Sequence, residues 1–140
     1  MHRLAPSFLL LALAACESSP LDRTPAPPLR YEIDTSWPRA GGPGLGEVTG
    51  VAVDASERVF VFHRAGRGFN NDEVITDPTI AIFDAATGAL LGETGADLFV
   101  VPHGLAIDAS GHLWATDVGN DTVVELLDDG TVLQTIEGNE

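Results

Sequence analysis

The hydrophobic and polar positions of this chain take on a β-type pattern from Val48 onwards. Short runs of β-branched and aromatic residues alternate with turns rich in Asp, Ser and Gly, which is typical of strands. Helical periodicity is absent outside the N-terminal apolar stretch. The first four strands are predicted over Val48–Val53, Arg58–Arg64, Thr79–Phe83 and Ala89–Glu93, with a polar loop over Ala65–Pro78.

The same pattern then occurs a second time. Gly50–Ser56 matches Gly104–Ser110, 54 residues further along the chain. Repeats of four-stranded units are typical of β-propellers. We therefore predict an all-β fold, a partial β-propeller with two four-stranded blades at about 46–95 and 96–138 plus an N-terminal strand at Tyr31–Asp34. The second set of strands is expected over Pro102–Ile107, Leu113–Thr116, Thr122–Leu127 and Thr131–Ile136.

The number of blades is low for this architecture. Propellers usually close with four to eight blades, so residues 40–140 are expected to form an incomplete propeller. Two explanations stay open, a fragment of a longer protein or one partner of an oligomer that completes a ring. In the second case the open blade edges could pair with a partner.

The N-terminal segment has the features of an export signal. Residues 1–15 combine a short positive region with an apolar stretch that is too short to span a bilayer. The sequence Leu13-Ala14-Ala15-Cys16 resembles the lipobox of bacterial lipoproteins, in which the cysteine carries the lipid; an ordinary secretory signal with an incidental cysteine is the alternative. Residues 16–39 are then a lipidated, Pro-rich tether with the strand that leads into the fold. By resemblance, Glu17 favours the outer membrane of a bacterial cell envelope.

The charge of the chain is strongly one-sided, with a formal net charge of −14. Such a surface repels phosphate backbones, so we expect no nucleic-acid partner. The hydrophobic content of 44% is too high for a disordered acidic tail.

Short motifs indicate a known type of repeat. Asp117-Val118-Gly119-Asn120, followed by Val123, resembles the D-x-G-N-x-x-V pattern of NHL repeats. Asp117 and Asn120 are expected to cap a turn by hydrogen-bonding nearby backbone amides.

Two further motifs narrow the resemblance. Phe62-His63-Arg64 ends one strand and is followed by a polar insertion, and Pro102-His103-Gly104 opens the second blade. Together, at this spacing, they resemble the peptidyl-α-hydroxyglycine α-amidating lyases. The resemblance covers about Gly46 to Leu127.

The resemblance implies a six-bladed, zinc-dependent propeller that splits a C-terminal α-hydroxyglycine into a peptide amide and glyoxylate, so a peptide or small amide would be the substrate. It implies that His103 is one of three zinc-binding histidines and that Arg64 is an active-site arginine. It also implies that the backbone carbonyls of Val51 and Leu105 hold a structural calcium ion. Oxygen ligands suit calcium, and imidazoles suit zinc.

Each of these residues also has a plain structural interpretation. His103 could be a core or turn histidine, and Arg64 could form a salt bridge with Asp72 or Glu73. His63 alternates with Arg64 along its strand, so it is expected to pack inside the fold. His112 is expected on the solvated surface.

The family's other two zinc-binding histidines and its catalytic tyrosine have no counterpart among these residues; Tyr31 lies upstream of the propeller strands. We therefore predict that the chain is inactive as it stands. Two alternative functions stay open, a propeller like the streptogramin-type lyases and a non-catalytic NHL-repeat module that binds a partner in the cell envelope.

Overall fold

The computed structural model describes residues 28–39 and 44–138. The chain divides into two compact units, Met1–Glu32 and Ile33–Glu140. The predicted signal sequence, the predicted lipidation site at Cys16 and the first half of the predicted tether, residues 16–27, lie outside the described residues. Within the described part of the chain, no helix has the length and hydropathy needed to cross a membrane.

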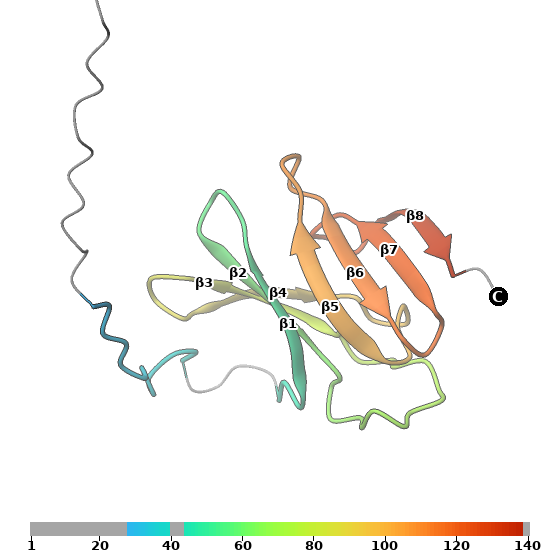
Figure 1. Ribbon diagram of the computed structural model, residues 1–140, viewed down its shortest axis with the longest axis horizontal. Helices are drawn as coiled ribbons and strands as arrows, with labels where there is room; N and C mark the ends of the chain where they lie inside the picture. Colours follow the sequence, from blue (N-terminus) through green and yellow to red (C-terminus); the bar gives the residue numbers. More distant parts are fainter. Residues whose placement is uncertain (1–27, 40–43, 139–140) are drawn as a thin grey trace, which may run out of the picture. The chain divides into compact units, whose positions relative to one another are not determined.

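The second unit contains two antiparallel four-stranded sheets, each with its strands in sequence order (Figure 1). This arrangement confirms the prediction of an all-β fold with two propeller-type blades that do not close into a ring. The first sheet consists of β1 (Val48–Val53), β2 (Arg58–His63), β3 (Ile80–Asp84) and β4 (Leu90–Thr94). The second consists of β5 (Pro102–Ile107), β6 (Leu113–Asp117), β7 (Thr122–Leu126) and β8 (Val132–Glu137).

One predicted strand is wrong. Tyr31–Asp34 forms no strand, and the side chains of Tyr31 and Ile33 are 86% and 92% exposed. The carboxylate of Asp34 accepts a hydrogen bond from the backbone amide of Ser36 at 2.9 Å. A local bond of this kind favours a turn over a sheet ladder, so the segment leads into the fold without joining a sheet.

The main core lies between the two sheets. Phe60, Phe62, Ile80 and Ile82 of the first blade pack against the second, and Phe62 meets Phe99 edge to face with ring centroids 4.9 Å apart. Alternation along the strands places these side chains on one face of each sheet. The second blade contributes Leu113, Ala115, Val124 and Leu126.

The innermost strands of the two blades, β1 and β5, lie side by side (Figure 1). Gly50 permits this approach, because a Cβ atom built there would lie only 2.8 Å from the backbone nitrogen of Leu105. The inner edges of both sheets are therefore brought together, and they position the candidate site.

The opposite face of the first blade is covered by the segment around Trp37. The indole ring lies 5.6 Å from the ring of Phe83, and its Nε1–H donates to the carbonyl of Ala85 at 3.2 Å. Leu45 also packs on this face. The chain that precedes β1 thus supplies the apolar cover that a neighbouring blade supplies on the other side.

Candidate functional site

Arg64 lies directly after β2 and is 8% exposed. Its Nε–H donates to the carbonyl of Pro102 at 3.2 Å, and its Nη1 forms an ion pair with Glu47. The first of these bonds connects the end of β2 to the start of β5. The structure therefore brings Arg64 to the backbone that carries His103, although 38 residues separate Arg64 from Pro102 in sequence.

The polar loop over Ala65–Pro78 reaches across to the same place. Its Phe69 ring lies 5.1 Å below the guanidinium carbon of Arg64 and is 54% exposed, a cation–π arrangement. Further along the loop, Asn71 Nδ2 donates to the carbonyl of Val100 at 2.8 Å, and the amide of Ile75 donates to the carbonyl of Phe99 at 2.8 Å. The loop is thus tied to the segment that leads into β5.

His103 occupies an irregular position in β5. The pairing of β5 with β6 shifts between Pro102 and Gly104, so His103 lies in a bulge and its side chain is exposed. Bulges re-aim side chains and are frequent near functional sites. His103 borders a shallow pocket of about 380 Å³ that is also lined by Thr116 and Val118.

Asp117, the last residue of β6, holds the segment that leads into β5 through its side chain. Its buried carboxylate accepts hydrogen bonds from the backbone amides of Val100 at 2.6 Å, Val101 at 2.7 Å and Gly119 at 2.9 Å. Asn120 Nδ2 adds a fourth donor at 3.1 Å. Asp117 therefore forms the expected turn cap, and it also holds the segment before His103. Asn120 donates to the Asp117 carboxylate and not to the backbone.

His63 occupies the position in the first blade that Asp117 occupies in the second. It is 1% exposed, as expected for a packing residue, and its Nδ1 accepts a hydrogen bond from the amide of Ala65 at 3.1 Å. Burial lowers the pKa of His63, and the nearby Leu45 backbone opposes this shift only in part. The neutral ring then carries its proton on Nε2, which has no partner within the described residues. His63 therefore supports the left-handed turn at Ala65 (φ 46°), directly after Arg64.

The carbonyls of Val51 and Leu105 point toward the inner edges of the two sheets. The Asp54 amide donates to the Arg58 carbonyl, so Asp54 and Arg58 form a hydrogen-bonded pair of the ladder between β1 and β2. Val51 pairs with Val61 three residues further along this ladder, and Leu105 holds the same ladder position in the second blade. Alternation along an antiparallel ladder makes both residues members of non-hydrogen-bonded pairs, whose N–H and C=O groups face away from the partner strand. Because β1 and β5 are the first strands of their sheets, these carbonyls are directed to the free edge.

The donor set of the described residues does not complete a zinc site at His103. A site of this type needs about three protein ligands, and the only group of three close His, Cys, Asp or Glu donors in the described part of the chain is Asp108, His112 and Glu125. Val51 and Leu105 together offer two oxygens, whereas calcium takes six to eight. The described residues thus fit part of each site.

Some residues around Arg64 were not anticipated. The salt bridge of Arg64 is made with Glu47, so the structure places neither Asp72 nor Glu73 in the suggested role. Glu47 directly precedes β1, and only the pairing of β1 with β2 brings it to Arg64. Phe69 could have been noticed as the one aromatic residue of the polar loop.

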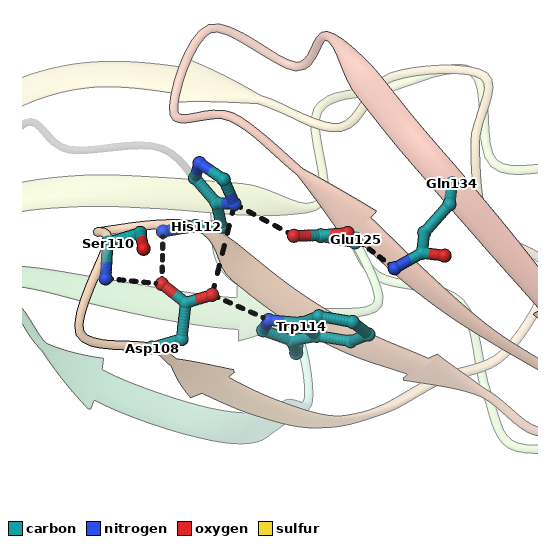
Figure 2. Close-up of polar contacts among 6 residues, drawn as sticks. All are labelled: Asp108, Ser110, His112, Trp114, Glu125 and Gln134. Atoms are coloured by element: carbon teal, nitrogen blue, oxygen red, sulfur yellow. Dashed lines mark hydrogen bonds and ion pairs between the residues drawn. The ribbon is translucent and has the colours of Figure 1, made fainter.

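His112 lies at the surface but is more enclosed than predicted. Its side chain is 32% exposed, and its Nδ1 lies 2.8 Å from Glu125 Oε1 (Figure 2). The pairing of β6 with β7 brings Glu125 beside the turn, so the side chain is held between two strands.

These features define an all-β chain of NHL-repeat type, built from propeller blades. Residues 99–126 match the NHL repeat, which includes the Asp117 turn.

Comparison with known proteins confirms the resemblance to the amidating lyases. The chain is 41% identical to a probable peptidyl-α-hydroxyglycine α-amidating lyase of Caenorhabditis elegans, over 56% of this chain and 26% of that protein. It is 40% identical to peptidyl-α-hydroxyglycine α-amidating lyase 2 of Drosophila melanogaster, over 59% and 23% respectively. Peptidyl-glycine α-amidating monooxygenase A of Xenopus laevis is 32% identical, over 70% of this chain and 12% of that protein. The aligned part of the chain thus spans about a quarter or less of the length of these relatives.

Proposed function

We propose that this chain forms the first two blades of a lyase that cleaves the C–N bond of a C-terminal α-hydroxyglycine. In that reaction the hydroxyl group loses its proton, the bond between nitrogen and the α-carbon breaks, and the nitrogen takes up a proton. The products are a peptide amide and glyoxylate. The single observation that carries the proposal is the bond from Arg64 to the Pro102 carbonyl, because it joins the two sequence motifs of the resemblance in one place.

Arg64 would act on the oxygen atoms of the substrate. The ion pair with Glu47, the Pro102 carbonyl and the Phe69 ring hold its guanidinium in one orientation. A fixed guanidinium stabilises a carboxylate or a developing oxyanion without the need to reorganise. Arg64 is therefore proposed as the residue that binds the glycine carboxylate or the reacting oxygen.

His103 is proposed as one zinc ligand, and the carbonyls of Val51 and Leu105 as part of a calcium site. The described residues supply neither ion with a full set of ligands, so the chain alone is proposed to be inactive. The incomplete set also favours a second function, a non-catalytic NHL module that binds a peptide. The two candidates differ in whether Arg64 and His103 contribute to turnover.

A chimera tests the proposal. Residues 46–127 of this chain would replace the matching part of the Caenorhabditis elegans relative, and glyoxylate release from an N-acyl-α-hydroxyglycine would be measured. We expect turnover by the chimera and none by the chain alone. Arg64→Met and His103→Ala should each lower kcat/KM at least 100-fold, a loss typical of a lost electrostatic or metal-binding group.

The control variant is Asp72→Asn, which removes an exposed charge from the loop that also carries Phe69. It should leave kcat/KM unchanged. A folded chimera that retains full turnover after His103→Ala would contradict the assignment of His103, and glyoxylate release by the chain alone would contradict the proposed inactivity.

We further propose that Cys16 carries a lipid that anchors the chain in a bacterial envelope. The sequence Leu13-Ala14-Ala15-Cys16 supports this proposal. Metabolic labelling with palmitate should mark the wild-type chain and spare Cys16→Ser; equal incorporation would refute the anchor.

A further inference from the structure

Asp108, His112 and Glu125 form a cluster at the far end of β5 from His103 (Figure 2). His112 Nδ1 lies 2.8 Å from Glu125 Oε1 and 3.8 Å from Asp108 Oδ2. One donor atom from each residue lies within 4.8 Å of the other two, and all three residues are partly buried. The cluster belongs to the second blade alone and takes no part in the proposed lyase site.

The first blade shows how the equivalent turn is held there by charged side chains. Its equivalent residues are Asp54 and Arg58, whose Oδ2 and Nε atoms lie 2.7 Å apart, and Arg58 Nη1 lies 2.8 Å from Asp128 Oδ2. A permanent cation thus bridges two carboxylates. In the second blade two carboxylates again converge, but the bridging residue is a histidine, which is cationic only when protonated. His112 thus lies between two carboxylates as Arg58 does, although Asp128 reaches Arg58 from the second blade, whereas Glu125 lies on the adjacent strand β7 of the same blade as His112.

The donor atoms are oriented by a second set of hydrogen bonds. Asp108 Oδ1 accepts from the amides of Ser110 and His112, and Asp108 Oδ2 accepts from Trp114 Nε1 at 3.1 Å. Gln134 Nε2 donates to Glu125 Oε2 at 2.6 Å, which leaves Glu125 Oε1 for His112. Such outer partners fix the direction of metal ligands in proteins.

We propose that Asp108, His112 and Glu125 bind a divalent transition-metal ion of the zinc type. One imidazole nitrogen and two carboxylate oxygens are suitable ligands for zinc. Donors around a tetrahedral zinc ion lie about 3.3 Å apart, and the two separations from His112, 2.8 and 3.8 Å, lie on either side of that value. A water molecule would take the fourth position, since the His112 side chain is 32% exposed.

The ion would bind His112 Nδ1 and link the turn between β5 and β6 to β7. Two carboxylates and a neutral imidazole carry a charge of −2, which a divalent ion neutralises. The metal would therefore join two carboxylates within the second blade, and it would stabilise the folded state.

Isothermal titration with ZnCl₂ tests the site on the full chain, with its single thiol at Cys16 blocked by alkylation. We expect one zinc ion per chain with an affinity that falls at least tenfold in Glu125→Gln and in His112→Arg. His112→Arg is the decisive variant, because it recreates the Asp54–Arg58 arrangement and should fold with undiminished stability. Glu93→Gln is the matched control, because it removes an exposed carboxylate of β4 outside the cluster, and it should bind zinc as the wild type does.

Two further readouts distinguish the cluster from the lyase site. Zinc should raise the Tm of the wild type and of Glu93→Gln, but not that of His112→Arg, and the imidazole ¹⁵N resonances of His112 should shift on zinc addition. Equal zinc affinity in His112→Arg and wild type would overturn the proposal, because His112→Arg keeps His103. Absence of wild-type binding at millimolar zinc would also overturn it. None of these results depends on the lyase proposal.

Discussion

Replacing Asp117 by Asn should destabilise the second blade, because the buried carboxylate accepts four hydrogen bonds. Oδ1 accepts from the amides of Val101 and Gly119, and Oδ2 accepts from Val100 and Asn120. An asparagine replaces one oxygen with an NH₂ group. In either orientation of the amide, two donors lose their acceptor and face another donor.

The size of the effect follows from these lost bonds. A hydrogen bond to a charged group contributes about 1.5–3 kcal/mol, and neighbouring bonds are not additive. We therefore expect a loss of about 3 kcal/mol, a large part of the roughly 5–15 kcal/mol by which domains are usually stable. For a domain of this size the Tm should fall by about 12–24 °C.

Urea unfolding followed by tryptophan fluorescence measures the change, and amide hydrogen exchange locates it. Protection should fall most at Val100 and Val101, which precede His103. Asp72→Asn is the control, because it removes the same charge from an exposed loop position and should change stability by less than about 0.5 kcal/mol. An Asp117→Asn variant within about 0.5 kcal/mol of the wild type would refute this account of the carboxylate.

Three further outcomes are expected from unfolding experiments. Gly50→Ala should lower the free energy of unfolding by about 1–3 kcal/mol, since its Cβ would lie 2.8 Å from a backbone nitrogen of β5. The control Gly92→Ala, with no atom within 4 Å of its Cβ, should not lower it. Equal effects of the two substitutions would contradict the close approach of β1 and β5. Burial alone would raise the pKa of Asp54, but hydrogen bonds from Arg58 and the turn lower this pKa overall. The stability of the fold should therefore fall as the pH drops through the range below about 4, and it should fall less steeply in Asp54→Asn. Burial lowers the pKa of His63, so the folded state binds fewer protons than the unfolded state, and stability should fall below about pH 6.5. If the stability of His63→Gln fell with the same slope in this pH range, the assignment to His63 would be contradicted.

The strands were predictable because they depend on local chemistry. Alternating apolar residues and turns such as Asp108–Gly111 repeat in both blades, and each predicted propeller strand ends within one residue of the observed strand. Asp108 accepts bonds from the amides of Ser110 and His112, so the turn is determined by a few adjacent residues. The strand at Tyr31–Asp34 failed because β-propensity alone supplies no partner edge.

The partners of the site residues depend on strand register and on contacts between the blades. Glu47 meets Arg64 only after β1 pairs with β2, and Asp117 reaches Val100 only after the chain folds back over 17 residues. His112 meets Glu125 through the pairing of β6 with β7. Sequence patterns identify these residues as candidates, but the geometry that joins them is tertiary.

NMR spectroscopy on the chain itself tests most directly whether Arg64 and the His103 segment share one site at adjoining inner edges. The account predicts NOEs between Gly50 and the amide of Leu105, and a scalar coupling through the hydrogen bond from Arg64 Nε to the Pro102 carbonyl. Assigned spectra that lack both signals, with the two sheets tumbling independently, would contradict it.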